Sequence, residues 1–342
     1  MNNVKVGRSS VVLNEPVYIE ASASVVGKKE GEGPLGLLFD RVGDDDMFGC
    51  NTWEEAESTL QKDAVYLALK KAEVKEEEIC YIFAGDLLGQ SIASSFGISK
   101  YEIPMFGVYG ACSTCGESLS LGAMTIAAGY APRVVCVTSS HFASAEKEFR
   151  FPLEYGNQRP LSATWTVTGS GAFVLCNEKN NKVRAQITGV TTGKIVDYGL
   201  KDSMNMGACM APAAASTLEQ HFKDFNVKPT EYDKIITGDL GSVGQKVLIN
   251  LLHDKGYDIS VNHIDCGIEI YDAKEQDTHA GGSGCGCSAV TLSAYILKQV
   301  EEGYWKKVLF VPTGALLSKT SFNEGKSVPG IAHAVVIESV DK

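Results

Sequence analysis

The sequence contains no hydrophobic run that approaches the roughly 20 uninterrupted apolar residues of a membrane span. Residues Met1 to Ser10 also lack the apolar segment of a secretory signal, so we expect a soluble protein of a cytoplasm-like compartment. Basic residues are few, 31 against 42 acidic ones, and the net charge is −11. This charge argues against nucleic acid as a partner, and an anionic ligand needs a local positive site.

The ten cysteines lack the loop spacing of a disulfide framework. Cys80, Cys136 and Cys176 lie in strand-like apolar runs, so we expect reduced thiols that pack as small core residues. With 342 residues, of which 44% are hydrophobic and 21% charged, the chain is long enough for one large core or two fused ones.

The sequence contains an internal repeat. Each half has a strand that ends in Gly-Asp-Leu, then a turn of small residues that opens a helix, then a further strand. Gly129 matches Gly303 and Arg133 matches Lys307, and both pairs are 174 residues apart. The paired segments are residues 79–87 with 234–240, residues 110–139 with 284–313, and residues 171–175 with 333–337. Such self-similarity indicates a duplicated fold.

The helices that follow the small-residue turns are almost free of charge, with only Glu117 in the first and Lys298 in the second. A helix that is apolar all round is a buried helix, so the repeat predicts an α/β sandwich with this pair between two sheets. The halves are expected at residues 1–180 and 181–342. A separate amphipathic helix is expected after the capping box at Thr52–Glu55.

Cys112 is the first candidate functional residue. It lies at the predicted start of a buried helix, where backbone N–H groups and the helix dipole stabilise a thiolate. The alternative is a small apolar core residue. Cys112 and Cys115 also form a C-x-x-C pair, matched by Cys285 and Cys287, so a metal or redox site is a further alternative. Adjacent thiols on a helix point in different directions, which favours packing and no metal.

Polar residues follow the strand that comes after Cys112 in the sequence. Ser139, Ser140 and His141 end one strand and begin a polar insertion at residues 142–160. Open α/β sheets bind ligands at the carboxyl ends of their strands, so these side chains are candidates for a pocket lining. A lone histidine there is otherwise a hydrogen-bonded structural residue. The insertion carries Tyr155, Arg150 and Arg159.

Asp86 and Asp239 are related by the repeat, and each follows a strand. An aspartate in this position is commonly a helix N-cap. If both faced a shared pocket, the pair could hold a cation or act as acid and base.

The segments Gly110–Thr114 and Thr313–Ser318 resemble the thiolase superfamily, as does the glycine turn of the second half. This resemblance implies a duplicated five-layer αβαβα sandwich with a nucleophilic cysteine at the position of Cys112. The whole chain more closely resembles the stage V sporulation protein AD family of spore-forming bacteria. The segments that carry this resemblance are residues 32–36, 84–88, 109–114, 138–141, 149–156, 168–172 and 281–285.

The closer resemblance implies a protein that binds dipicolinic acid, or its calcium chelate, during uptake into the developing spore. It also implies a role in germination, other stage V sporulation A membrane proteins as partners, a peripheral place on the spore inner membrane, and by analogy a homodimer. No cofactor is expected, apart from calcium within the chelate. The expected ligand contacts are Asp86, Cys112, Ser113, Ser139, Ser140, His141, Arg150, Asp239 and Ser283, with Arg159 as a second source of positive charge.

The chain departs from the catalytic members of the superfamily. It has Gly238-Asp239 where ketoacyl synthases place a histidine, and Ser283 where they place an asparagine. His279 lies close to the sequence position at which degradative thiolases carry a histidine, but its spacing to the glycine turn differs by one residue. A thiol without a base has little catalytic advantage, so we expect a retired active site that binds. The alternative is an acyltransferase with Cys112 as nucleophile and His141 or His279 as base.

Overall fold

The computed structural model describes residues 4–149 and 159–340, so Arg150 and Tyr155 lie outside the described residues. The elements of the first half are β1 (Val4–Val6), β2 (Ser10–Val26), α1 (Lys28–Gly31), β3 (Arg41–Val42), α2 (Trp53–Ala72), β4 (Tyr81–Gly85), α3 (Ile92–Ile98), β5 (Met105–Gly107), α4 (Thr114–Ala127), β6 (Arg133–Ser140), α5 (Phe142–Phe149), β7 (Trp165–Thr166) and β8 (Gly169–Cys176).

The elements of the second half are β9 (Ala185–Thr191), α6 (Met206–Phe225), β10 (Lys234–Thr237), α7 (Gly241–His253), β11 (His263–Asp265), α8 (Cys266–Glu269), β12 (Gly282–Ser283), α9 (Cys285–Thr291), α10 (Leu297–Glu301), β13 (Lys307–Val311), β14 (Thr313–Ala315), α11 (Lys319–Asn323), β15 (Gly330–Ala332) and β16 (Ala334–Glu338). A π-helical segment, Leu292–Ile296, joins α9 to α10. Short 3₁₀ helices occur at Gly36–Leu38, Glu76–Glu78, Gly89–Ser91, Ser99–Tyr101 and Pro229–Glu231.

The main sheet displays the repeat directly. Its strand order is β11-β10-β13-β16-β9-β2-β8-β6-β4-β5, which has the same arrangement when read from either end. The outer strands of each half are parallel, whereas β6 with β8 and β13 with β16 are antiparallel. At the centre, β2 pairs with β9, so the two halves share one continuous sheet. The predicted junction at residues 178–182 connects β8 to β9.

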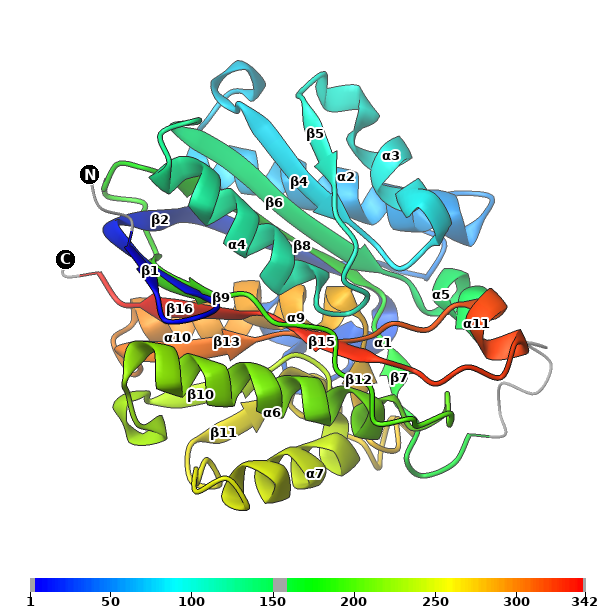
Figure 1. Cartoon of the computed structure of the whole chain (residues 1–342). Helices are drawn as coiled ribbons and strands as arrows, with labels where there is room; N and C mark the ends of the chain where they lie inside the picture. Colours follow the sequence, from blue (N-terminus) through cyan, green and yellow to red (C-terminus); the bar gives the residue numbers. More distant parts are fainter. Residues whose placement is uncertain (1–3, 150–158, 341–342) are drawn as a thin grey trace.

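Helices pack on both faces of this sheet, as Figure 1 shows. Helices α2 and α3 cover the strands of the first half, and α6 covers those of the second half, with α7 packed on α6. Between them, α4 contacts β6, β4 and β16, and α9 contacts β6, β8 and α4. Both central helices therefore touch strands of the first half, and α4 also reaches the second. This confirms the predicted α/β sandwich with two buried helices, although the strands of both halves form one continuous twelve-stranded sheet and not the two sheets that the repeat predicts.

Capping and proline signals in the sequence predict where several of these elements begin and end. Thr52 caps α2, because its Oγ1 accepts a hydrogen bond of 3.2 Å from the N–H of Glu55. Strand β10 ends at Thr237, directly before the Gly-Asp-Leu turn, as predicted. Strand β13 ends at Val311 because Pro312, which lacks an N–H donor, follows it. Within the described ranges, none of the helices combines the length and the apolar character needed to cross a bilayer.

Glycines allow the central helices to lie close against the sheet. A Cβ atom at Gly171 of β8 would lie 2.7 Å from the backbone and side chain of Ala289 in α9. A Cβ atom at Gly286 would lie 2.4 Å from the carbonyl oxygen of Gly169. These glycines therefore set the spacing between α9 and β8.

The Gly171→Ala substitution tests this spacing. Because the added methyl group meets backbone atoms that cannot move aside freely, we expect it to lower the free energy of unfolding by about 1–3 kcal/mol. Gly107→Ala is the matched control, since nothing lies within 4 Å of its Cβ position and we expect a change within about 0.5 kcal/mol. Chemical denaturation measures both. Equal stability of the two variants would show that α9 can shift away from β8 without cost.

Candidate functional site

Cys112 lies in a tight turn between β5 and α4. Ala111 adopts a positive φ of 51°, which reverses the chain just before the cysteine. The hydroxyl of Ser113 donates to the carbonyl of Gly110 at 2.6 Å, and the hydroxyl of Thr114 donates to that of Ala111 at 2.6 Å. These local bonds fix the turn, so small hydroxyl residues after Cys112 hold its thiol in one place.

The repeat brings the matching turn of the second half against this cysteine. The sulfur of Cys112 lies 3.9 Å from Oγ of Ser283, and Ser283 donates to Oδ2 of Asp239 at 2.8 Å. Leu87, Ala145 and Cys285 pack with Cys112 in a small buried apolar cluster. Three predicted site residues, Cys112, Asp239 and Ser283, are thus assembled from both halves of the chain.

The electrostatics at Cys112 differ from the prediction. Burial raises the pKa of the Cys112 thiol well above its ordinary value, and the negative charge of Asp239 raises it further. The predicted stabilisation of a thiolate is therefore wrong. Helix α4 begins only at Thr114, and the loss of solvation outweighs the helix dipole at this depth. The thiol is neutral at physiological pH.

Asp239 connects the glycine turn to the closing strand. Its Oδ2 also accepts a hydrogen bond of 3.0 Å from the N–H of Gly284, and its Oδ1 accepts one of 2.7 Å from the hydroxyl of Thr313. Burial raises the pKa of Asp239, while these bonds lower it. A carboxylate held in this way orders the turn around Cys112 and is already supplied with donors.

Asp86, the repeat partner of Asp239, is occupied within its own half. Its Oδ1 accepts from the N–H of Leu88 at 2.8 Å, and its Oδ2 accepts from the N–H and hydroxyl of Ser94 at 2.8 and 2.6 Å. Asp86 is not an N-cap residue, since Ser91 holds that position in α3, but its carboxylate accepts from the N–H of Ser94 in the first turn of this helix. Among residues 4–149 and 159–340, no three His, Cys, Asp or Glu side chains gather as a metal site.

A buried polar network lies next to Asp86 and takes up Ser139. Oγ of Ser139 donates to Glu57 at 2.9 Å and accepts from Nε2 of Gln61 at 2.9 Å. Gln61 also donates to Oγ of Ser94 at 2.9 Å, which connects the network to Asp86. Burial and, to a lesser degree, the charge of Asp86 raise the pKa of Glu57 to about 8. Helices α2 and α3 are thereby tied to the ends of β4 and β6.

Ser140 and His141 also have partners within the chain. Oγ of Ser140 donates to the carbonyl of Val167 at 2.7 Å and accepts from the N–H of Gly286 at 3.1 Å. Nδ1 of His141 accepts from the N–H of Ala143 at 3.2 Å, so Nε2 carries the proton that bonds the carbonyl of Asp46 at 2.7 Å. Burial lowers the pKa of His141. It is a neutral structural histidine.

His279 and Arg159 make hydrogen bonds with Pro160 and Asp277. Nδ1 of His279 lies 2.9 Å from the carbonyl of Pro160, and Nε2 lies 3.1 Å from Oδ1 of Asp277. Arg159 donates to the carbonyl of Asp277 at 2.7 Å and stacks over the ring of Trp165 at 4.8 Å. Both ring nitrogens of the second candidate base are thus occupied away from Cys112.

The paired cysteines point to separate backbone groups. The thiol of Cys285 donates to the carbonyl of Ser139 at 2.8 Å, and that of Cys287 donates to the carbonyl of Gly238 at 3.5 Å. Cys115 is fully buried in the central core. All ten cysteines of the chain are free. These contacts match the packing alternative.

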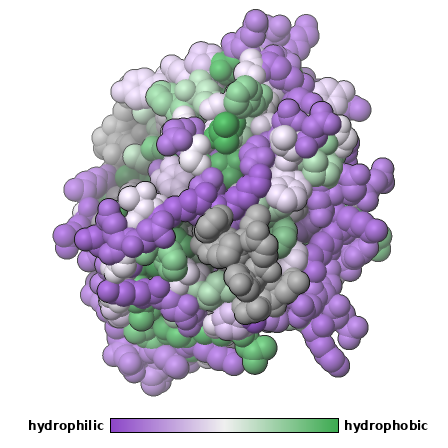
Figure 2. Space-filling view, turned by 90° about the vertical axis from the view of Figure 1, so that its right-hand side faces the viewer, coloured by the Kyte–Doolittle hydropathy of each residue, from purple (hydrophilic) through white to green (hydrophobic). Residues whose placement is uncertain are grey.

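A surface cleft of about 310 Å³ adjoins the Cys112 cluster. Leu87 belongs to both, so one side chain separates the cleft from the thiol. At the rim, Nζ of Lys319 lies 3.8 Å from Oε2 of Glu148. The cleft is lined by Leu87, Leu88, Gly89, Gln90, Ser91, Tyr109, Glu148, Leu317, Ser318 and Lys319. Figure 2 shows the side of the molecule that carries α5 and α11, where a narrow band of hydrophobic atoms runs between hydrophilic ones.

The sequence interpretation missed Glu57, Gln61 and Lys319. Glu57 and Gln61 lie four residues apart beside the apolar positions of α2, and this spacing puts both on the buried face. Polar residues at that spacing in an apolar stripe were the available signal. Lys319 gave no such signal, because only the folding of α11 beside α5 and the loop after β4 brings it to the cleft.

Comparison with known proteins gives two kinds of match. The model of the stage V sporulation protein AD (SpoVAD) family matches residues 7–338. The stage V sporulation protein AD of Bacillus subtilis (strain 168) is 43% identical over 332 residues, covering 97% of each chain.

Solved structures resemble the chain in fold. OleA from Xanthomonas campestris with cerulenin has a TM-score of 0.60 at 14% identity, covering 96% of this chain and 97% of that one. The 3-oxoacyl-[acyl-carrier-protein] synthase III of Aquifex aeolicus VF5 has a TM-score of 0.56 at 15% identity, covering 94% and 99%. Human mitochondrial 3-ketoacyl-CoA thiolase with CoA has a TM-score of 0.56 at 13% identity, covering 96% and 99%. These matches confirm the predicted thiolase-like fold.

The raised pKa of Cys112 predicts that its thiol resists alkylation. In the folded protein at pH 7.5, we expect iodoacetamide to label Cys50 and Cys80, the two half-buried cysteines, well before Cys112. Peptide mass spectrometry measures the time course, and alkylation in denaturant gives the reference in which all ten cysteines are labelled. Faster labelling of Cys112 than of Cys50 would show a reactive thiolate and contradict the electrostatics described here.

Glu57 predicts a pH dependence of stability. Its pKa is raised from about 4.5 in the unfolded chain to about 8 in the folded protein, so the folded state binds more protons between these values. The contribution of Glu57 to the free energy of unfolding therefore falls as the pH rises from about 4.5 to about 8. Glu57→Gln should flatten this slope, as measured by urea unfolding at pH 5.5 and pH 8. An unchanged slope in the variant would exclude Glu57 as its source.

Proposed function

The chain belongs to the stage V sporulation protein AD family, as its motifs predict, and we propose that it binds dipicolinic acid or its calcium chelate without catalysis. In this role the protein takes part in moving the ligand into the developing spore. The observation that carries the proposal is that Asp239, and not a histidine, lies beside Cys112, and that its carboxylate already accepts from Ser283, Gly284 and Thr313. A carboxylate there raises the pKa of the thiol, whereas a nucleophile needs a group that lowers it or takes its proton.

The cleft beside Leu87 is the proposed binding place. Its volume of about 310 Å³ suits a small ligand, and Leu87, Leu317 and Tyr109 offer apolar surface for a flat aromatic ring. Lys319 and the hydroxyl of Ser91 offer donors for the carboxylates, whereas the hydroxyl of Ser318 already donates to Ser321. Dipicolinate has this combination of a flat ring and two carboxylates.

This place revises the predicted contacts. Asp86, Ser113, Ser139, Ser140 and His141 already bond to their own chain, so in the proposed mode they support the cleft and do not face the ligand. Cys112 lies behind Leu87, with Asp239 and Ser283 beneath it. Arg150, which lies outside the described residues, stays a predicted contact.

Calcium enters the proposal only as part of the ligand. The chelate is neutral overall, whereas free dipicolinate is a dianion that meets a protein of net charge −11. Glu148 lines the cleft and offers a hard oxygen ligand of the kind that calcium prefers, whereas Asp86 and Asp239 are occupied. We therefore expect the chelate to bind more tightly than the free acid.

The proposal extends to partners. Other stage V sporulation A proteins of the spore inner membrane are the proposed recipients of the ligand, and peripheral association with that membrane and a role in germination belong to the same proposal. A homodimer is proposed through β5, because this edge strand is exposed and carries the exposed side chains of Met105 and Phe106. A second copy would cover both.

The proposal predicts a calorimetric titration with dipicolinate that depends on Lys319. Lys319→Gln should weaken binding about three- to fivefold, because one exposed ion pair is lost. Lys326→Gln removes the same charge from an exposed position outside the cleft and should bind like the parent protein. Runs with calcium and with excess chelator compare the chelate with the free acid.

Two outcomes would end the binding proposal. One is the absence of heat with dipicolinate in either form. The other is equal binding of pyridine-2,5-dicarboxylate, an isomer of the same charge whose carboxylates point to opposite ends of the ring, since a shaped cleft must distinguish the two. Incubation with a labelled acyl-thioester tests the acyltransferase alternative separately, because a label recovered on Cys112 would show that the thiol still accepts acyl groups.

A further inference from the structure

A second cleft, of about 220 Å³, lies at the other end of the molecule from α11, next to α10 (Figure 1). Its lining comes from both halves of the chain, since Lys71 belongs to α2, Arg184 precedes β9 and Lys298 belongs to α10. The lining residues are Leu37, Leu38, Asp40, Lys71, Arg184, Ser293, Ala294 and Lys298. Three cations and one carboxylate therefore meet in one small space.

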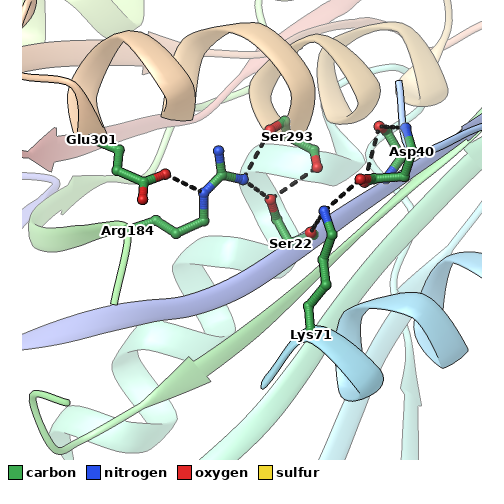
Figure 3. A network of polar contacts seen from close by, with 7 residues as sticks. Ser22, Asp40, Lys71, Arg184, Ser293 and Glu301 are labelled. Carbon is green, nitrogen blue, oxygen red and sulfur yellow. Dashed lines mark hydrogen bonds and ion pairs between the residues drawn. The ribbon is translucent and has the colours of Figure 1, made fainter. Parts of the chain in front are cut away.

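Arg184 is held rigidly in this cleft. Its Nε donates to Glu301 at 3.0 Å, and its Nη1 donates to Oγ of Ser22 at 2.6 Å and to the carbonyl of Ser293 at 3.0 Å (Figure 3). Its second terminal nitrogen, Nη2, makes no hydrogen bond to the residues drawn in Figure 3. The guanidinium is thus fixed with one donor edge left for another group.

The carboxylate of Asp40 is largely committed. Its Oδ1 pairs with Nζ of Lys71 at 2.5 Å, and its Oδ2 accepts from the N–H of Ser24 at 2.9 Å. Lys71 also donates to the carbonyl of Ser22 at 2.9 Å, so its ammonium is fixed at the cleft. Lys298 is exposed, and its charge adds to that of the two fixed cations. The cleft is positive although the protein as a whole is not.

The helix that lines this cleft is irregular at the same place. Residues Leu292–Ile296 are π-helical, and Ser293 and Ala294 of this segment line the cleft. A π-helical turn inside a longer helix costs hydrogen-bond geometry and occurs frequently at functional sites. Here the widened turn presents the carbonyl of Ser293 to Arg184, so it positions the guanidinium.

We propose that this cleft binds a phosphate group. A rigid arginine edge with two lysines matches a tetrahedral oxyanion, whose oxygens accept several charge-assisted hydrogen bonds at once. The volume suits a group of this size and no large ligand. Leu37, at the rim, is 103% exposed, so the phosphate of a lipid headgroup is one source and a soluble phosphate ester is the other. This site is separate from the proposed dipicolinate cleft and does not depend on it.

Equilibrium dialysis with labelled inorganic phosphate tests the site, with the full chain at low ionic strength. We expect saturable binding that weakens as salt is added, and Lys298→Gln should weaken it about three- to fivefold. Lys246→Gln is the matched control, because it removes the same charge from an exposed position on α7. Parent-like binding by the control supports the site. Equal losses in both variants, or no saturable binding by the parent protein, would overturn it.

Vesicles distinguish the two sources of phosphate. If the source is a lipid, the protein should sediment with phosphatidylglycerol vesicles and not with phosphatidylcholine vesicles, and Leu37→Ser, which leaves the charge unchanged, should abolish sedimentation while inorganic phosphate still binds. Phosphate binding without sedimentation supports a soluble phosphate ester at the same site. Sedimentation that Lys298→Gln leaves unchanged would place lipid binding elsewhere and count against the cleft.

Discussion

Exclusion of water from the layer that holds α4 and α9 is the constraint on which the other features depend. An ionisable group in that layer must be neutral or fully supplied with hydrogen bonds, because the interior does not solvate charge. Cys112 is neutral for this reason, and Asp239 has three donors around it. The same rule holds for Glu57 in the outer helix α2, where burial raises the pKa of its carboxyl to about 8. The chemistry left to such a site is recognition more than proton transfer.

Much of the fold follows from short-range patterns. The capping box at Thr52 and the nearly uncharged segments after Cys112 and Cys285 act through local hydrogen bonds and burial, and both are visible in one stretch of sequence. The repeat then supplies the arrangement of layers. What the sequence could not predict is the pairing of β2 with β9, because each is a strand with buried faces and nothing local identifies its neighbour.

The site was predictable only in part, for a similar reason. The family resemblance implies one site that contains Cys112, Asp239 and Ser283, and these three residues do lie together. Which atoms a buried side chain bonds depends on neighbours remote in sequence, as with Ser139 and Glu57, 82 residues apart. The thiolate prediction failed because the sequence gives the nearness of a helix start but not the depth of burial.

The long central strand has a mechanical consequence. Residues of β2 pair with β8 of their own half and with β9 of the other, so one strand carries hydrogen bonds to both. Neither half can open its sheet at this strand without exposing unpaired backbone groups of its neighbour. The repeats are therefore not separate folding units, and the chain should lose its structure in a single cooperative transition, with the amides of β2 among the last to exchange their hydrogens with solvent.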